Sequence, residues 1–496
     1  MSALRGAGPA VHLAAAAVAA AAAVGAAHVS IPLFVVAAAA GLAVVGHAAV
    51  RWPLATLVGG ALATLADPVL VPRLLPPGVG SGPIGLSEPV LAVAGSVIAV
   101  QALRSARWRT ALRDPVVPLV ALFVGLAILS AALNAVPPLV AALDIVMTID
   151  AVAIYVVVRA QPVDERAASL AVTAVVVATL VVAIIGLGQV VVHPRFLGLD
   201  TFSGNFGEGA RITSFLGNPN PVAMVLSIGI PFALFGSVSL SGARERWAAS
   251  IALLVLVLAL VFTFSRSGWL AVGIGVLIIG LVVDRRALLV FMVTVVVAVG
   301  LFSVLPRGLA APQPSQDGGA AIPPSDLVDS TVDRLGNLAR EGDTRRRYTV
   351  EGIPILLDHP WLGVGPGRYG GAAATLLPSP IYDEYDTGLY GYRTIHSFWQ
   401  HLLGESGALG TAVFLAILAG LLLRVARAAR LAGGRRRVIL AGVAGMVVIT
   451  GLHSLTEMIY EGTLPALLIW LLLGLASMLA PIRPLLGDRS GASQAA

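Results

Sequence analysis

Long apolar runs, separated by short charged or Pro/Gly-containing breaks, cover most of the 496-residue chain. A helix that crosses the hydrocarbon core of a bilayer needs roughly 20 mainly apolar residues, so the pattern predicts about fourteen spans. The pair 53–72 and 88–103 is the weakest, because Asp67 interrupts the first and the second is short. If both are re-entrant or interfacial, about twelve spans remain. The predicted spans are 10–27, 31–50, 53–72, 88–103, 115–133, 137–158, 167–191, 214–238, 247–264, 267–283, 287–305, 397–423, 438–457 and 463–482.

Composition supports an all-α polytopic membrane protein and excludes an ordinary soluble domain. Hydrophobic residues make up 57% of the chain, charged residues 12%, and the mean hydropathy is +0.91, whereas soluble domains carry about a quarter charged residues. The absence of cysteine excludes disulfides, thiol catalysis and cysteine-ligated metals. All 32 basic residues are arginine, and arginines beside membrane spans explain the basic pI of about 10.1 without a nucleic-acid partner. The Ala-rich N-terminal run is interpreted as a first span, not a signal peptide.

Arginine placement predicts the orientation of these spans. Twenty arginines fall in one set of short loops, which the positive-inside rule assigns to the cytoplasm together with both termini. The other twelve face outward, mostly in one long extracytoplasmic loop that contains short helices and escapes the charge rule. The predicted regions are N-terminal spans 1–160, central spans 161–305, the extracytoplasmic loop 306–395, C-terminal spans 396–483 and a cytoplasmic tail 484–496.

Two outward-facing segments carry polar groups at a membrane-span end. "GARITSFLGNPNP" brings Arg211 and Asn220 to the start of a span, and its two prolines break the helix. Its asparagines either cap the helix or form the floor of a polar cavity. "FTFSRSGWLA" places Arg266 in a hairpin with almost no loop. Arg266 either snorkels to the headgroups or grips a lipid-linked phosphate through its planar guanidinium.

The long outer loop has a mobile linker followed by a helix. Residues 306–328 are rich in Pro, Gly and Ala, as linkers are. A helix is predicted from Asp343 or Thr344 to about Leu357, with Arg345, Arg346 and Arg347 in its first turn. Cations there oppose the helix dipole, so the pattern indicates either an anionic partner or a solvated basic face. The segment "DHPWLGVGPGRYGG", which contains Arg368, lacks the spacing of a dinucleotide-binding loop and predicts a tight turn.

The next span begins with a second group of polar residues. His396 lies at its outer end, with Gln400 four residues on and therefore on the same face. His401 and Glu405 form another such pair, and helical rise puts Glu405 roughly 13 Å below His396. A carboxylate inside the membrane indicates either function or a helix-packing hydrogen bond. His396 is the candidate general base, with capping or packing as the alternative.

Four motifs occur in the order found in the O-antigen ligase/polymerase superfamily: "GARITSFLGNPNP", "FTFSRSGWLA", "RRRYTVEGIPILLDHPWLGVGPGRY" and "HSFWQHLLGESGALG". The resemblance covers roughly 205–410. It departs from the family at His396-Ser397, where His-Asn is common, and at Tyr348 or Thr349, where a Trp is expected. The resemblance implies a GT-C-like membrane glycosyltransferase in the bacterial cytoplasmic membrane. It would transfer a glycan from an undecaprenyl-diphosphate carrier to an acceptor hydroxyl at the outer leaflet, without metal or cofactor and with inversion.

By position, the resemblance implies roles for individual residues in polysaccharide biosynthesis at the cell envelope. The catalytic residues would be His396 as base with Arg266 and Arg345 on the diphosphate. The substrate-binding residues would be Arg211, Asn220, Arg346, Arg347, Arg368, Gln400 and Glu405. A polysaccharide polymerase, whose acceptor is another lipid-linked repeat, remains an alternative, and so does a transporter, although the chain has no internal repeat. The sugar and the acceptor, whether glycan, lipid or protein, stay open.

Overall fold

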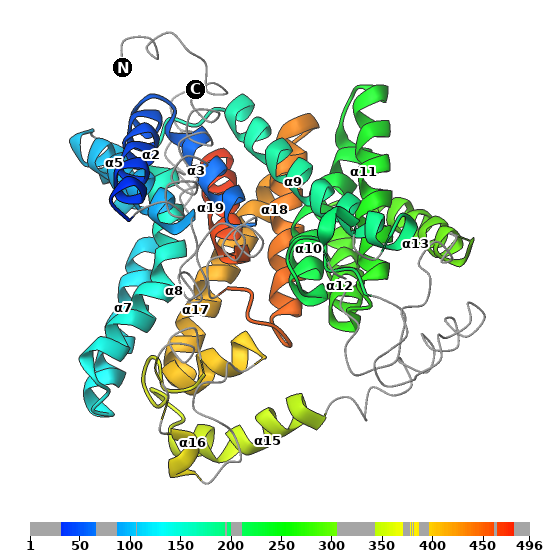
Figure 1. Cartoon of the computed structure of the whole chain (residues 1–496). Coiled ribbons are helices and arrows are strands. Elements are labelled where there is room, and N and C mark those ends of the chain that lie inside the picture. The colour runs from blue at the N-terminus through cyan, green and yellow to red at the C-terminus, as the bar shows by residue number, and fades with distance from the viewer. Residues whose placement is uncertain are drawn as a thin grey trace, which may run out of the picture.

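The computed structural model describes residues 31–65, 87–105, 107–193, 196–199, 211–304, 343–370, 377, 379, 381–385, 396–460 and 464–480. The regular secondary structure of this part of the chain is helical, as predicted, and it contains no β-strand (Figure 1). The predicted first span 10–27, the linker 306–328 and the tail 484–496 lie outside the described residues.

The helices follow the predicted spans closely, often to within one or two residues at each end. They are α2 Ile31–Arg51, α3 Pro53–Ala63, α5 Ser87–Arg104, α6 Arg107–Leu112, α7 Val116–Leu133, α8 Pro138–Arg159, α9 Glu165–Val191, η2 Phe196–Gly198, α10 Pro219–Ser239, α11 Ala243–Phe262, α12 Arg266–Val282, α13 Arg286–Val304, α15 Asp343–Asp358, α16 Ile381–Glu384, α17 Phe398–Leu431, α18 Gly434–His453 and α19 Leu464–Leu479. The weakest prediction, 53–72, corresponds to α3, which ends at Ala63. The second prediction of that pair, 88–103, is a full helix.

Seven of the described helices are long and apolar enough to cross a membrane: α7, α9, α10, α11, α13, α17 and α18. An eighth is α8, if its two halves, which are bent by 46°, form one span. Five further apolar helices have 10–17 residues, and the predicted count of about 12–14 spans is reached only when these shorter helices are included. The fold is therefore that of an all-α polytopic membrane protein.

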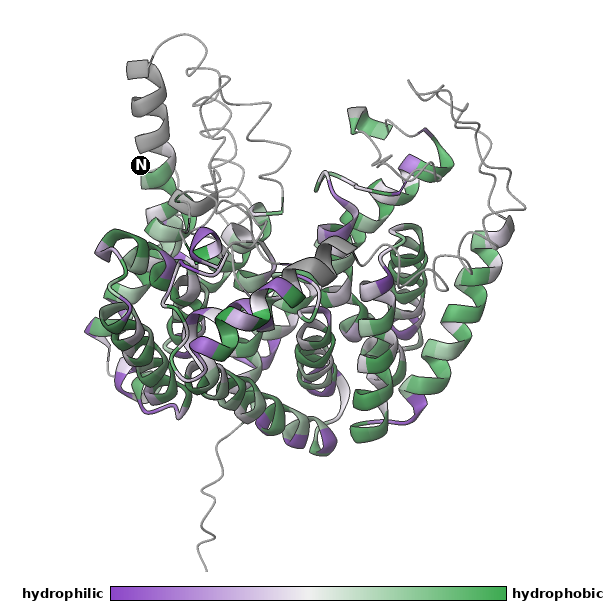
Figure 2. Ribbon diagram, turned by 90° about the horizontal axis from the view of Figure 1, so that it is seen from below, coloured by the Kyte–Doolittle hydropathy of each residue, from purple (hydrophilic) through white to green (hydrophobic). Residues whose placement is uncertain are grey.

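Helix α10 forms the core of the bundle and is buried over 83% of its most apolar window. It packs against α18, α11 and α9, while α17 packs on α7 and α19 on α8. Small residues permit these close contacts: a Cβ on Gly229 would lie 2.2 Å from the Thr179 hydroxyl oxygen. Such residues are typical of helix interfaces in membranes, where packing replaces the hydrophobic effect between helices. Most residues of the bundle helices are apolar, as Figure 2 shows, and many large apolar side chains are exposed on their outward faces.

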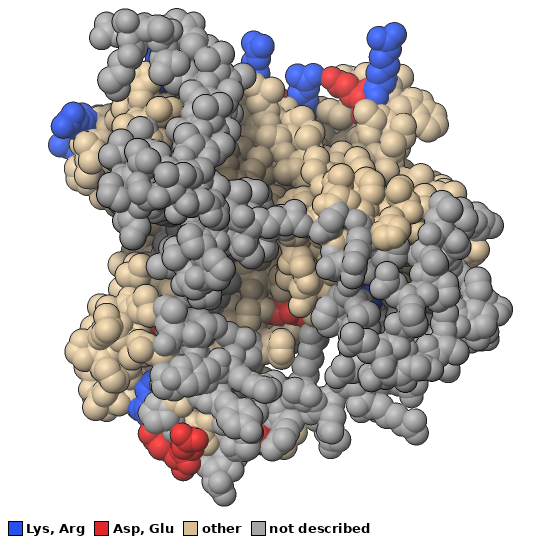
Figure 3. Space-filling view, viewed as in Figure 1, with Lys and Arg blue, Asp and Glu red and all other residues tan. Residues whose placement is uncertain are grey.

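Arginine side chains gather at one end of the described surface, at the top in Figure 3. Here Asp114, which is fully buried, accepts from Arg159 at 3.0 Å and from Arg424 at 3.1 Å. Both guanidinium groups also donate to the carbonyl oxygen of Ser477 near the end of α19. Cations stabilise a helix C-terminus by satisfying its last carbonyls. We call this the inner end, because its arginines belong to the set predicted to be cytoplasmic, and the opposite end, where α15 and α16 lie, the outer end (Figure 1).

The shared carboxylate of Asp114 leads to a first prediction. We expect Asp114→Asn to lower the free energy of unfolding by about 3–5 kcal/mol, because it leaves two buried guanidinium groups without their counter-charge. The matched control is Glu245→Gln, since Glu245 pairs with Arg435, whose side chain is 58% exposed, and exposed pairs contribute less than about 1 kcal/mol. Thermal unfolding of the two variants and the unmodified protein in the same detergent measures both losses of stability. Equal shifts for the two variants would contradict this account of the inner end.

Candidate active site

The hairpin that carries Arg266 lies at the outer end, between α11 and α12. Phe264 adopts a left-handed conformation with φ of 50°, which turns the chain sharply after α11. Ser265 then caps α12 by accepting a hydrogen bond from the backbone N–H of Gly268. Arg266 is the first residue of α12 and is half-buried. It therefore lies at a helix N-terminus, where the dipole favours a bound anion.

Arg211 and Asn220 lie beside this hairpin. The Arg211 Nε donates to the carbonyl oxygen of Thr263 at 2.8 Å, and its Nη2 donates to Asn220 Oδ1 at 3.2 Å. Asn218 caps α10, with its Oδ1 accepting from the backbone N–H of Asn220 at 2.9 Å. The predicted capping role thus belongs to Asn218, whereas Asn220 holds Arg211. The structure brings Arg211, Asn220 and the Arg266 turn together, as expected for one binding surface.

The C-terminal end of α18 links this surface to the start of α17. Buried His453 has its Nε2 3.4 Å from the Ser267 hydroxyl, next to Arg266. The Phe398 backbone N–H donates to the carbonyl oxygen of Ser454 at 3.1 Å. His396, which is exposed, precedes Phe398 by two residues. One helix end therefore contacts both the hairpin of Arg266 and the segment of His396.

Gln400 connects α17 to the loop helix α15. Its Nε2 donates to the Tyr369 hydroxyl at 3.2 Å, and its Oε1 accepts from the Thr349 hydroxyl at 3.2 Å. A Cβ on Gly352 would lie 1.9 Å from the Tyr369 hydroxyl oxygen, so only glycine allows α15 to approach this closely. Burial raises the pKa of the Tyr369 hydroxyl, although the hydrogen bond from Gln400 lowers it, so this hydroxyl stays neutral.

Helix α15 begins where the sequence predicts, and Figure 1 shows it at the outer end of the bundle. The side chains of Arg345, Arg346 and Arg347 lie outside the described residues, so their roles stay predictions. Position 345 is four residues before Thr349 and seven before Gly352. Residues at these spacings share one helix face, and here that face meets Gln400 and Tyr369.

The segment 360–370, which we call the glycine turn, is inserted into a break in α17. Gly407 has φ of 62° and ψ of −168°, which interrupts the helix and frees backbone groups on both sides. Val364 N–H donates to Gly404 O at 2.8 Å, and Ala408 N–H donates to Pro360 O at 2.8 Å. Two further bonds of this kind join Gly365 to Glu405 and Leu409 to Trp361. The predicted tight turn is thus paired with α17 through its backbone.

Three polar side chains, Ser130, Asn134 and Glu384, support the glycine turn from neighbouring helices. Ser130 donates to the carbonyl oxygen of Leu362 at 2.6 Å, and Asn134 donates to that of Gly363 at 3.0 Å. Arg368 forms an ion pair with Glu384 of α16 at 2.7 Å and donates to Asn134 O at 3.4 Å. Arg368 therefore has a structural role in the described residues, and its contact with substrate stays a prediction.

Glu405 is only 5% exposed and also supports the glycine turn. Its Oε1 accepts from the Tyr369 backbone N–H at 3.0 Å, and its Oε2 is 3.6 Å from His401 Nε2. Ligand atoms of Asp144, His401 and Glu405 all lie within 4.8 Å of one another. Spacing along the chain predicts the His401–Glu405 pair, but it does not predict that Asp144 joins them, because no local spacing connects α8 to α17.

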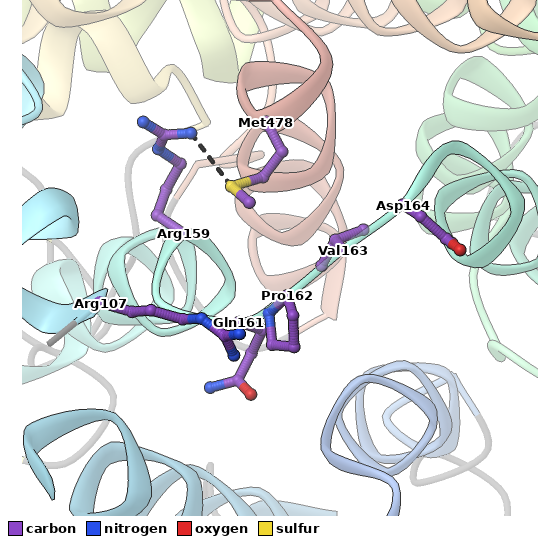
Figure 4. A pocket seen from close by; sticks show the side chains of 7 residues that line it. All are labelled: Arg107, Arg159, Gln161, Pro162, Val163, Asp164 and Met478. Carbon is purple, nitrogen blue, oxygen red and sulfur yellow. Dashed lines mark hydrogen bonds between the residues drawn. The ribbon is translucent and has the colours of Figure 1, made fainter. Parts of the chain in front are cut away.

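A cavity of about 500 Å³ lies at the other end of the bundle. It is lined by Arg107, Arg159, Gln161, Pro162, Val163, Asp164 and Met478 (Figure 4). The guanidinium group of Arg159 donates to the Met478 sulfur at 3.0 Å, toward the bundle and away from Arg107 in this view. This cavity contains none of the predicted site residues, so the polar surface of the outer end remains the candidate active site.

The fold and this surface define a polytopic membrane protein whose outer end brings Arg211 and Arg266 together with other polar groups. Comparison with known families identifies the class more closely: residues 251–415 match the family described as O-antigen ligase. The match runs from α11 into α17 and includes Arg266, His396 and the glycine turn, and it confirms the resemblance predicted from the motifs. A comparison with curated proteins found no match. The family implies a glycosyl-transferring enzyme that acts on a lipid-linked glycan.

The break in α17 leads to a second prediction. Gly407→Ala places a side chain at positive φ and a Cβ 2.3 Å from the Trp361 carbonyl carbon, so the turn should be expelled. We expect protection of the Val364 and Ala408 amides in hydrogen exchange to fall about tenfold or more, since a side chain in this glycine-only region of φ and ψ alone costs about 1–3 kcal/mol.

Gly420→Ala is the matched control, because Gly420 lies in the same helix with nothing within 4 Å of its added Cβ. It should leave the protection of the glycine turn unchanged. Unchanged protection in Gly407→Ala as well would show that the turn does not depend on this break.

Proposed function

We propose that this protein transfers a glycan from an undecaprenyl-diphosphate carrier to an acceptor hydroxyl on the extracytoplasmic side of the bacterial cytoplasmic membrane. One observation carries the proposal: the end of α18 contacts both the Ser265–Ser267 hairpin and the segment that begins α17. The donor's diphosphate and the acceptor's hydroxyl would meet across this helix end. The O-antigen ligase match over 251–415 supports this type of reaction.

The donor diphosphate would bind where α10 and α12 begin. Arg266 lies at the N-terminus of α12, and Arg211 lies beside it, held by Thr263 and Asn220. Two guanidinium groups and two helix N-termini supply positive potential in one place. Guanidinium groups bind phosphate oxygens through paired hydrogen bonds, which would neutralise the charge that develops on the departing diphosphate.

His396 would activate the acceptor as general base. It is exposed at the outer end and lies two residues before the helix that the α18 terminus holds. In a single displacement, the acceptor oxygen bonds to the anomeric carbon while the carbon–oxygen bond to the diphosphate breaks. The acceptor proton passes to His396 Nδ1 or Nε2, and the configuration inverts. No metal takes part in this step.

Helix α15 would supply the remaining positive charge. Of the three consecutive arginines, position 345 shares the helix face of Thr349 and Gly352, which meets Gln400 and Tyr369. This register favours Arg345 as the catalytic arginine, with Arg346 and Arg347 as outer contacts for substrate. Gln400, Arg368 and Glu405, also predicted to bind substrate, would hold α15 and the glycine turn in position beside it. A polysaccharide polymerase would use the same donor surface, so the product decides between the two.

Removal of the arginines is the third prediction. Arg266→Ala and Arg345→Ala should each lower kcat about 10²–10³-fold, the usual cost of losing one group that stabilises developing charge. His396→Ala should lower kcat about 10²–10⁴-fold. The assay is transfer by purified protein from a defined undecaprenyl-diphosphate glycan to candidate acceptors, with the product identified by mass.

Arg435→Ala is the matched control, because Arg435 lies at the inner end with its side chain 58% exposed. It should retain nearly full transfer. Full transfer by both Arg266→Ala and Arg345→Ala would refute the proposed mechanism, and a product made only of joined donor repeats would identify a polymerase.

A further inference from the structure

Two carboxylates from different helices lie at the same depth below the outer end. Asp144 is the seventh residue of α8, and Glu405 is the eighth residue of α17. Helical rise puts each of them roughly 9–11 Å below the start of its helix. His401 lies one turn above Glu405, and none of the three is more than 5% exposed. The cluster of Asp144, His401 and Glu405 is therefore a buried polar site in an apolar bundle.

The charge of this cluster requires compensation. Ligand atoms of all three side chains lie within 4.8 Å of one another. Two ionised carboxylates at that separation in a buried site repel each other and carry a large desolvation penalty. A neutral imidazole does not offset them, whereas one divalent cation would bring the charge of the cluster to zero. Metal coordination is one of the few states in which such charges persist in protein interiors.

The orientation of His401 fits a metal ligand. Its Nδ1 is 3.4 Å from the carbonyl oxygen of Tyr369, which leaves Nε2 facing Glu405. Metal-bound histidines typically donate their other ring N–H to a carbonyl or carboxylate, and this contact fixes the tautomer. Glu405 is oriented in a similar way, because its second oxygen accepts from the Tyr369 backbone N–H.

The space beside the cluster is the size of one ion. A cavity of about 20 Å³ is lined by Asp144, His401 and Glu405 together with apolar side chains, among them Phe123 and Phe398. A cavity of about 10–15 Å³ already holds one water molecule, so this one accepts a single ion or water and is far too small for a sugar.

We propose that Asp144, His401 and Glu405 bind one divalent transition-metal ion, for which zinc is the best fit. One imidazole and two carboxylates are donors that zinc accepts, and a water would complete a tetrahedral site. The ion joins α8, α17 and, through Tyr369, the glycine turn. It has a structural role and does not contact the donor diphosphate, so the transfer chemistry does not pass through it, although Glu405 also holds the glycine turn.

The test is the metal content of the full chain, purified in detergent through a histidine-free tag and without chelator. Elemental analysis should find about one zinc or similar ion per chain, falling below about 0.1 in Asp144→Asn and in His401→Ala. The matched control is Asp284→Asn, since Asp284 pairs with Arg437 at the inner end. That variant should keep the metal.

A second measurement uses the unmodified protein, so the test does not depend on the variants folding. Chelation should lower Tm by several degrees, and added zinc chloride should restore it. Less than about 0.1 divalent metal per chain, together with a Tm that neither chelator nor zinc changes, would overturn the proposal and leave a cluster that shares protons instead. Neither readout uses glycan transfer, so this proposal and the proposed function can fail separately.

Discussion

Backbone pairing between the glycine turn and the break in α17 is the interaction on which the outer end depends. Gly407 interrupts the helix, and the freed carbonyl and N–H groups bond to residues 360–365 of the turn. Buried backbone groups must find partners, and in a membrane neither water nor lipid supplies them. The break and the turn therefore stabilise each other. Because the turn directly follows α15, its position also determines where the arginine-bearing loop helix lies.

The two ends of the bundle use charge in different ways. At the inner end, Asp114 pairs with two arginines, and α19 offers its terminal carbonyls to the same groups. At the outer end, Arg211 is held by a carbonyl and an amide, and Arg266 lies at a helix N-terminus. The first arrangement stabilises the fold. The second leaves positive potential at an accessible surface, which is what a phosphate-bearing donor requires.

Local patterns predicted most of the fold, because span length, prolines and caps are properties of contiguous sequence, while the roles of the candidate site residues stay predictions. The limits of α7 and α15 and the hairpin before Arg266 were found in this way. Packing determined the rest. The break at Gly407 lies inside one predicted span, 397–423, so span length does not reveal it. His453 meets Ser267, and Asp144 meets His401, only because helices distant in sequence pack together. The one signal for this contact in the sequence was the polar pair His453-Ser454 inside the predicted span 438–457.

The central claim is that the glycine turn holds α15 against the start of α17, and a cross-link tests it most directly. The chain has no cysteine, so a Thr349→Cys, Gln400→Cys pair reports on this contact alone. The account predicts that a short bis-maleimide joins the two cysteines within one chain in native membranes, because the side chains that they replace are hydrogen-bonded at 3.2 Å. It also predicts that Gly407→Ala in the same background abolishes this cross-link. Failure of the pair to cross-link in correctly inserted protein would contradict the account.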